Sequence, residues 1–303
     1  MGLRIRTNIS SLVAQRRLGL STNEIHESMA KLASGSRINK AADDAAGLAI
    51  SENLKADIRS LNQAKRNALD GVSLVQTAEG GLEETSNILI RLRELAIQAA
   101  SDTIGDVERS FVNKEYIALK DEIDRIASTT EFNGTRLLAG NRDLGPELSN
   151  KSDRFPLDIH VGKNFFEGAD QSDSPVNIIK IDFSKMNVFT DGENSLNLGK
   201  GEEGTKVDTK ESAQRSIATI DEAMKKISES RAYLGAIQNR LACTSRNLEV
   251  YTENISEANS RIRDTDYASE TANYTQYNIL QQAGASVLAN ANVQPQIALK
   301  LLQ

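Results

Sequence analysis

The sequence predicts a mainly α protein with a small β region: a long antiparallel helical bundle and coiled coil formed by both termini, and a short strand-rich centre. Two stretches keep an apolar residue at every seventh position for seven positions, which is typical of helices packed along a narrow seam. The first column reads Leu54, Leu61, Ala68, Val75, Leu82, Leu89, Ala96, and the second reads Ile220, Ile227, Leu234, Leu241, Leu248, Ile255, Ile262. The four prolines are Pro146, Pro156, Pro175 and Pro295. They leave residues 1–145 and 176–294 free for long helices, whose interiors exclude proline.

The first helix is expected over residues 8–33, because Asn8 or Ser10 is a suitable N-cap and residues 34–36 read Ser-Gly-Ser, which breaks a helix. A second helix is expected from Asp43 and Asp44, whose charges suit a helix N-terminus, to about residue 100. The Gly-Gly pair at residues 80 and 81 costs about 1 kcal/mol per glycine relative to alanine. We expect the helix to continue through this pair.

A third helix is expected over residues 106–128. Asn133 and Gly134 then form a turn signal, and residues 136–138 could begin a strand. The region from about 141 to 209 differs in composition, because it holds five of the seven phenylalanines: Phe155, Phe165, Phe166, Phe183 and Phe189.

Within this centre, residues 157–161 alternate as a half-buried strand does, and residues 176–183 are rich in β-branched side chains. Residues 186–190 are expected to pair with the second of these strands. A long helix is then expected over residues 210–263, carrying the second heptad column.

Smaller residues stand beside each heptad column and would let helix axes approach closely. They read Ala64, Gly71, Ala78, Thr85, Leu92, Ala99 in the first run and Ala223, Ser230, Ile237, Thr244, Tyr251, Ala258 in the second. The two runs are therefore expected to be partners. They could be antiparallel or parallel, depending on the path of the centre.

The tail from Tyr267 to Gln303 has only two charged side chains, Glu270 and Lys300. A solitary surface helix normally carries many charges, so this segment is expected to be buried against other chains or to line a polar, uncharged cavity. A helix docked within one monomer is the simpler alternative, but it would have to place many amides against a core. The apolar residues of the tail include Leu280, Ala283, Val287 and Leu288.

Composition and motifs argue against several function classes. The net charge of −6 disfavours general nucleic-acid binding, although Arg4, Arg6, Arg16 and Arg17 all precede the first acid. This basic N-terminal segment could bind a membrane surface, a nucleic acid or an acidic helix, or it could be a helix face exposed to solvent. No apolar run could span a bilayer or serve as a cleaved secretory signal.

No catalytic constellation is found. His26 and His160 are far apart, and residues 199–206 resemble a phosphate loop but end in Gly-Thr-Lys instead of Gly-Lys-Ser/Thr. Lone Cys243 is interpreted as a small packing residue. We therefore expect no enzyme activity, cofactor or metal.

Five segments, in order along the chain, resemble bacterial flagellin, the filament subunit of the flagellum. They comprise residues 32–47, residues 91–98, residues 131–134 with Leu137 and Leu138, residues 260–268, and residues 279–302. The resemblance covers about residues 5–140 and 208–303. Arg6 departs from it, because an Asn is often seen in the opening motif.

The resemblance implies three domains. Residues 1–42 plus 264–303 would form an inner coiled-coil domain lining the filament channel, with Leu280, Ala283, Val287 and Leu288 packed in the inner tube. Residues 43–140 plus 208–263 would form a helical rod domain with a β-hairpin, whose two long runs are arms of one antiparallel hairpin. Residues 141–207 would be a short β-rich segment at the outer tip, so the filament is expected to be thin or smooth.

The resemblance also implies a function and partners. The subunit would self-assemble into the helical filament for swimming motility, after unfolded export through the flagellar type III apparatus to the outside of the cell. Its partners would be copies of itself, an export chaperone, the filament cap and hook-associated junction proteins. Toll-like receptor 5 would contact Arg91, Leu95 and Glu115, although Ile90 stands where a Gln is common; the same residues could instead pack between subunits.

Two other functions compete with a filament subunit. A hook–filament junction protein shares the same ends but fits the central helical motifs less well. A non-polymerising coiled-coil signalling protein would explain the heptads, but not the strand-rich centre or the uncharged tail.

Overall fold

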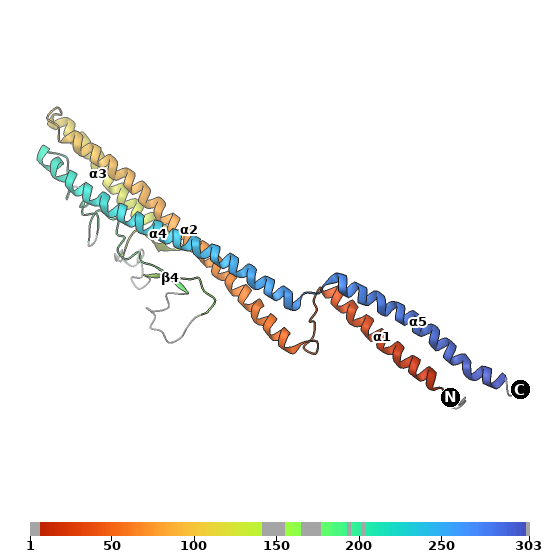
Figure 1. Ribbon diagram of the computed structural model, residues 1–303. Coiled ribbons are helices and arrows are strands. Elements are labelled where there is room, and N and C mark those ends of the chain that lie inside the picture. The colour runs from red at the N-terminus through yellow and green to blue at the C-terminus, as the bar shows by residue number, and fades with distance from the viewer. Residues whose placement is uncertain (1–6, 141–154, 165–176, 193–194, 202–203, 301–303) are drawn as a thin grey trace. The chain divides into compact units, whose positions relative to one another are not determined.

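The computed structural model describes residues 7–140, 155–164, 177–192, 195–201 and 204–300, with side chains as far as Val293. The chain divides into two compact units (Figure 1). The terminal unit comprises Met1–Ile58 and Glu253–Gln303, and the central unit comprises Arg59–Thr252. Two long helices, α2 (Ala45–Ala99) and α4 (Lys210–Arg263), contribute to both units.

The terminal unit pairs the first helix, α1 (Ile9–Ser34), with the last, α5 (Tyr267–Lys300). The Asn8 side chain caps α1 by accepting a hydrogen bond from the Ser11 amide, which confirms one of the two predicted caps. Gly35 ends the helix with a φ of 70°, a left-handed conformation that suits glycine. The two helices run antiparallel, because the side-chain Nδ2 of Asn8 donates to the Ala291 carbonyl (2.7 Å) and the Tyr267 hydroxyl to the Leu32 carbonyl (2.9 Å).

Short main-chain contacts join the end of α1 to the end of α4. The Arg37 amide donates to the Arg263 carbonyl, and the Thr265 amide donates to the Gly35 carbonyl (3.0 Å). Arg263 also forms an ion pair of 2.7 Å with Glu52 near the start of α2. All of these contacts lie within the terminal unit, where they join the α1–α5 pair to the first turns of α2 and the last turns of α4.

In the central unit α2 and α4 are antiparallel, as the resemblance implied and as the residue spacing alone had left open. Arg93 forms an ion pair with Asp221 (2.7 Å) and Lys65 with Glu249 (2.9 Å), so the two bridges lie 28 residues apart on each helix, or four heptads. The heptad columns face inward: in the central unit every member of the first is at most 1% exposed and every member of the second at most 6%.

The Gly-Gly pair lies inside α2 without interrupting it, as expected. The two glycines differ in their surroundings. A Cβ on Gly81 would lie 2.7 Å from Leu138 and 2.8 Å from the Thr130 hydroxyl, whereas a Cβ on Gly80 would meet no atom within 4 Å. Gly81 therefore permits the close approach of the chain that follows the third helix.

That third helix, α3 (Asp106–Thr129), leads into a hairpin of β1 (Glu131–Phe132) and β2 (Thr135–Arg136). Both turn residues, Asn133 and Gly134, have positive φ (50° and 73°), as a two-residue hairpin turn requires. The strand thus begins one residue before the predicted 136–138 segment.

The centre contains a second antiparallel pair, β3 (Leu157–His160) with β4 (Ile178–Ile181), in which Leu157 lies opposite Ile181. The prediction that residues 186–190 pair with this second strand is wrong. A tight turn, in which the Met186 amide donates to the Phe183 carbonyl, directs them to the chain after β2. There Asn187 bridges to Ala139 and the Val188 amide donates to the Leu138 carbonyl.

The single cysteine, Cys243, is exposed on α4, and Arg246 donates a hydrogen bond to its sulfur (3.2 Å). The prediction that Cys243 is a packing residue is therefore wrong.

Among the helices described here, none combines the length and apolarity needed to cross a membrane.

Candidate interaction surfaces

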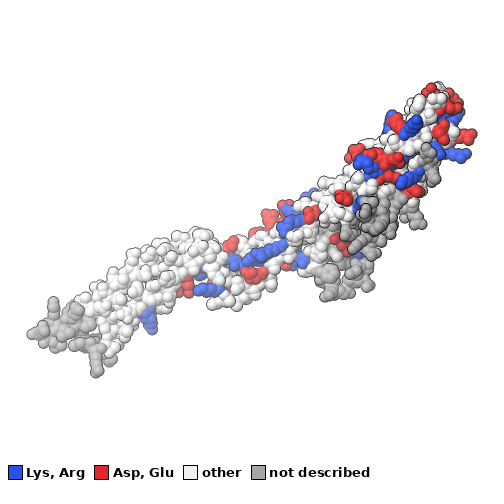
Figure 2. Space-filling view, turned by 180° about the vertical axis from the view of Figure 1, so that it is seen from behind, with Lys and Arg blue, Asp and Glu red and all other residues white. Residues whose placement is uncertain are grey.

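The first candidate surface is the solvent-exposed surface of the α1–α5 pair, which we call the terminal face. Its large apolar side chains are each at least 44% exposed: Ile9, Leu12, Val13, Leu20 and Met29 on α1, and Tyr267, Ile279, Leu280, Val287 and Val293 on α5. Glu270 is the one charged side chain described on α5. Figure 2 accordingly shows few charged side chains over the terminal helices and many over the central unit.

The seam between α1 and α5 explains why so much apolar surface remains outside. It is made largely of small or polar side chains: Ser11, Ala14, Ser28 and Ala291 are buried there with Ile25. Ser11 donates to the Asn292 side chain (2.8 Å) and Gln281 to the Thr22 hydroxyl (3.2 Å). The polar groups of the two helices thus satisfy one another, and the larger apolar groups face outward.

The four tail residues predicted for inner-tube packing lie on or beside this face. Leu280 (47%), Val287 (58%) and Ala283 are exposed, and Leu288 is half-buried. Leu280 also lines a hollow along α5, together with Tyr267, Ala268, Thr271, Ala272, Thr275, Gln276 and Ile279. The hollow and the many exposed apolar side chains on a single chain indicate a site of contact with another molecule.

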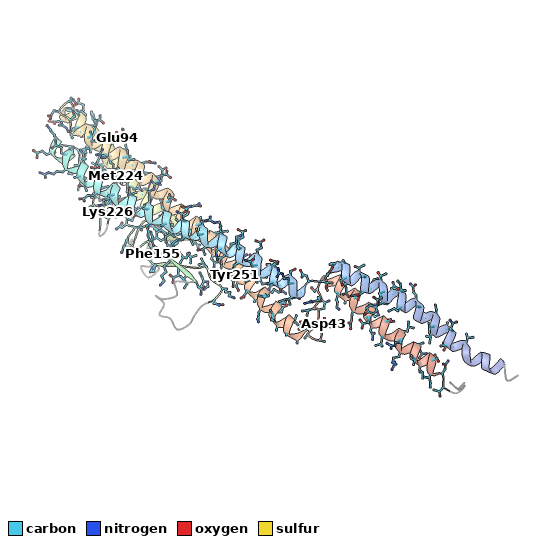
Figure 3. The ribbon with its side chains drawn as sticks, viewed as in Figure 1. Asp43, Glu94, Phe155, Met224, Lys226 and Tyr251 are labelled. Carbon is cyan, nitrogen blue, oxygen red and sulfur yellow. The ribbon has the colours of Figure 1, made fainter. Side chains whose placement is uncertain are left out.

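The second candidate surface lies on α2 and α3 of the central unit. Arg91 donates through Nε (3.0 Å) and Nη2 (2.8 Å) to one Glu115 oxygen, and through Nη1 to Glu94 (3.0 Å), which projects from α2 in Figure 3. Hydrogen bonding to Glu115, and then to Glu94, raises the pKa of the Arg91 guanidinium above its ordinary value. Leu95 is 1% exposed and belongs to the core. Of the three predicted contact residues, Arg91 and Glu115 are brought together at the surface and Leu95 is not.

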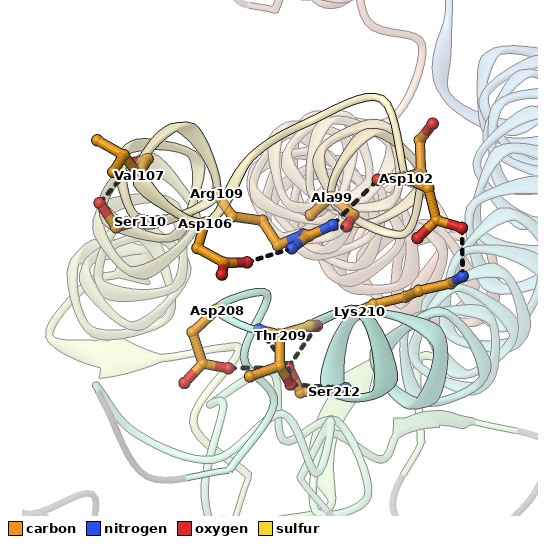
Figure 4. A network of polar contacts seen from close by, with 11 residues as sticks. Ala99, Asp102, Asp106, Val107, Arg109, Ser110, Asp208, Thr209, Lys210 and Ser212 are labelled. Carbon is orange, nitrogen blue, oxygen red and sulfur yellow. Dashed lines mark hydrogen bonds and ion pairs between the residues drawn. The ribbon is translucent and has the colours of Figure 1, made fainter.

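Polar contacts surround the connection from α2 to α3, where Arg109 is buried with only 8% of its side chain exposed (Figure 4). It donates to the carbonyls of Ala99 (2.8 Å) and Ser101 (3.1 Å), which the end of a helix leaves without intrahelical partners, and to Asp106 (2.7 Å). Lys210, at the start of α4, reaches Asp102 in the same connection (2.6 Å).

The sequence reading missed Arg109 and also Lys120, which is fully buried. Residue spacing could have identified both as buried, because they share one helix face with the other buried residues of α3. The buried residues of this face are Arg109, Tyr116, Lys120, Ile123 and Ala127. The two charged side chains obscure this signal, because the buried face of a helix is ordinarily apolar. In the described part of the chain, no group of three His, Cys, Asp or Glu residues could hold a metal ion.

Residues 5–143 match the N-terminal helical region of bacterial flagellin, and residues 217–302 match its C-terminal helical region. The chain belongs to the bacterial flagellin family. It is 42% identical to a flagellin of Halalkalibacterium halodurans, over 99% of both chains. It is 41% identical to a flagellar filament 33 kDa core protein of Treponema phagedenis (99% of both) and 40% identical to a flagellin of Bacillus subtilis (99% of this chain and 100% of the relative).

Two solved structures are similar to this flagellin. The crystal structure of Bacillus cereus flagellin is 30% identical and matches 60% of this chain and 88% of its own, with a TM-score of 0.46. A chain described as a flagellar hook-associated protein of Vibrio parahaemolyticus is 14% identical, with a TM-score of 0.54 over 73% of this chain and all of its own. At this identity the second likeness concerns the fold alone.

As a flagellin, the protein is a structural subunit that is exported and self-assembles into the extracellular filament of the bacterial flagellum. It is not an enzyme. Family membership also sets aside the coiled-coil signalling protein.

Proposed function

We propose that this flagellin polymerises through the terminal face, and that Leu280, Ala283, Val287 and Leu288 pack against neighbouring copies in an inner tube of the filament. One observation carries the proposal: α5 leaves Leu280 and Val287 exposed on a helix with a single described charge. Burying an exposed leucine or valine contributes roughly 1.5–3 kcal/mol, and a helical polymer repeats this gain at every subunit.

The test is seeded polymerisation followed by electron microscopy. Deletion of residues 264–303 is expected to abolish filaments, and Val287→Lys is expected to slow elongation at least tenfold because an unpaired charge would be buried. Val287→Thr is the matched control, since it keeps the shape without a charge and should still form filaments. Filaments of normal length from the truncated chain or from Val287→Lys would contradict the proposal.

The domain boundaries implied by the sequence form part of the same proposal. Residues 1–42 with 264–303 would form the inner domain, residues 43–140 with 208–263 the surrounding helical domain, and residues 141–207 the outer segment. Cryo-electron microscopy of filaments would test these boundaries, because each domain should occupy its own radial shell.

We further propose that an export chaperone covers α5 before assembly, and that the filament cap and hook-associated junction proteins contact the same terminal face. The support is physical, because an apolar surface of this extent needs a cover while the subunit is monomeric. A photo-cross-linking residue at position 287 should capture a chaperone when assembly is blocked. The same probe at Val250, an exposed valine of the central unit, should not.

Arg91 and Glu115 are proposed to contact either a neighbouring subunit or Toll-like receptor 5. Their side chains are about half exposed, at 49% and 47%, and so are accessible on the monomer, whereas Leu95 would support them from the core. Arg91→Ala should lower receptor signalling by monomers at least tenfold if the receptor contact is real. Arg125→Ala, an exposed arginine of α3, is the control. Unchanged signalling by Arg91→Ala would leave intersubunit packing as the role of this pair.

A further inference from the structure

The first helix of this flagellin carries a periodic row of side chains on the part of its surface that α5 leaves exposed. Successive members are three or four residues apart, so they lie along one face of α1. All of them are exposed, and the apolar ones are at least 44% exposed. We call these six residues the α1 row: Ile9, Val13, Arg16, Leu20, Asn23 and Glu27. The row therefore has the spacing with which one helix packs along another.

Two members of the α1 row carry opposite charges. Arg16 lies between apolar members, and Glu27 is the last member. Two further charges are exposed beside the row, because Arg17 and Glu24 lie seven residues, or about two helical turns, apart. The helix thus presents a basic pair, Arg16 with Arg17, followed by an acidic pair, Glu24 with Glu27.

Neither pair has a partner within the described chain. Over the residues that the structure describes, none of these four side chains forms an ion pair or a side-chain hydrogen bond. The one described charge of α5 is Glu270. Two other acids of the terminal unit are already engaged, because Glu52 pairs with Arg263 (2.7 Å) and Glu257 pairs with Arg261. The charges of the α1 row are therefore available to another molecule.

Polymerisation through the terminal face would remove some of these charges from water. Ile9, Val13 and Leu20 belong to that face, so a copy that covers them also covers Arg16 among them. An unpaired charge that loses its water is strongly unfavourable. The covering copy must therefore supply an acidic group beside Arg16 and a basic group beside Glu27. This requirement rests on the proposed burial of the terminal face.

We propose that α1 of one copy lies beside α1 of the next, with the basic pair of the first against the acidic pair of the second. Arg16 and Glu27 are eleven residues apart, or about 16 Å along the helix, so two parallel α1 helices offset by this distance bring them together. Each copy then uses its basic pair toward one neighbour and its acidic pair toward the other. Head-to-tail contacts of this kind generate an open helical filament.

The charges set the offset between the two helices more than the strength of their association. Complementary charges across an interface contribute mainly specificity and register, whereas like charges placed together are strongly unfavourable. The apolar members of the α1 row could pack at several offsets. The position of the basic pair relative to the acidic pair selects one of them.

Charge reversal tests the pairing in seeded elongation of the full-length chain, followed by light scattering. Arg16→Glu with Arg17→Glu should slow elongation by about tenfold or more, because like charges would meet. Glu24→Arg with Glu27→Arg should do the same. The chain with all four substitutions has complementary pairs again, so it should elongate at close to the wild-type rate.

A control variant separates this contact from a change in net charge. Glu83→Arg with Glu84→Arg alters the net charge as much as reversal of the acidic pair does, at exposed positions on α2 of the central unit. This variant should elongate at the wild-type rate.

Two outcomes would overturn the pairing. Reversed pairs that elongate normally, while Val287→Lys does not, would show that the terminal face is covered but that the α1 charges stay in water. Slow elongation of the chain with all four substitutions would show that the two pairs do not meet. Normal elongation of Val287→Lys contradicts the proposed function, and the charge variants still decide whether α1 helices meet.

Cross-linking tests the same contact without charge reversal, should a reversed variant fail to fold. In a Cys243→Ser background, Arg16→Cys with Glu27→Cys places two thiols about 16 Å apart on one helix, too far for a bis-maleimide of half that length. Filaments of this variant should yield covalent multimers, whereas its monomers and filaments with either cysteine alone should not. Filaments of the double variant that yield no multimers would overturn the contact.

Discussion

At the scale of single residues, the buried charges of α3 were the hardest feature to predict. Arg109 and Lys120 occupy positions that the helical period reserves for the core, yet each is satisfied by carbonyls that only the folded chain brings near. Leu95 poses the opposite difficulty. The resemblance marked it for contact with another chain, but the structure buries it. Sequence spacing gives the face of a helix, whereas the depth of that face depends on neighbouring elements.

Arg109 is expected to stabilise the connection between α2 and α3. Arg109→Ala would leave the Ala99 and Ser101 carbonyls without their charged donor and should lower the free energy of unfolding by about 2–3 kcal/mol. Urea unfolding followed by circular dichroism would measure the loss. Arg125→Ala is the control, because Arg125 is 62% exposed and its pair with Glu122 should contribute less than about 1 kcal/mol. Equal effects of the two substitutions would contradict a special role for Arg109.

Adjacent glycines in α2 provide a second, matched pair. Gly80→Ala should stabilise the protein by about 0.5–1 kcal/mol, because its methyl group enters open space and alanine favours the helix. Gly81→Ala should destabilise it by about 1–2 kcal/mol, because its methyl group would collide with Leu138 and Thr130. Thermal unfolding of both variants checks the prediction, which requires shifts of opposite sign.

At the scale of elements, helices were predicted better than strand partners. The predicted limits of α4, residues 210 and 263, are those observed. The limits of α1 differ by one residue at each end, and those of α3 by one residue at its C-terminal end. Heptad spacing and the absence of proline are local signals and suffice to predict the long helices α2 and α4. The partner of residues 186–190 was wrong because alternation in a strand gives its buried face but not the neighbour with which it bonds.

The turn between α1 and α2 should be sensitive to acid. The Asp43 carboxylate accepts from the amides of Lys40 and Asn39 (both 2.9 Å), and these bonds, that of Lys40 first, hold the pKa of Asp43 below its ordinary 3.8. The stabilisation is therefore present above pH 3.8 and is lost as the pH falls through the lower folded value. Asp43→Asn should reduce the acid dependence of stability between pH 5 and about pH 2, measured by urea unfolding. Glu27→Gln, an exposed carboxyl on α1, should leave it unchanged.

At the scale of the whole molecule, charge and apolar surface are segregated. The described ion pairs of the central unit hold helices together, whereas the terminal face offers exposed apolar groups, and its helix α5 has a single described charge. The uncharged tail was visible in the sequence and indicated a helix covered by other chains. The small polar seam that turns its larger side chains outward could not be predicted, because it depends on the register of α1 against α5.

Assembly driven by apolar burial should respond to salt in a characteristic way. Sulfate strengthens apolar association because it is excluded from protein surfaces. Seeded elongation should therefore accelerate in ammonium sulfate and change little in sodium chloride of equal ionic strength, as followed by light scattering. Equal slowing by both salts would instead indicate that screened ion pairs drive polymerisation.

The four-heptad spacing shared by the Arg93–Asp221 and Lys65–Glu249 bridges constrains how the gene for such a subunit can change in length. An insertion in one arm alone would misalign every later pair, and one that is not a multiple of seven would also rotate the apolar column out of the seam. Viable changes in arm length must therefore be compensated in two distant stretches of coding sequence at once. Insertions between the arms carry no such condition, so evolution can enlarge the middle of the subunit while both arms keep a fixed length.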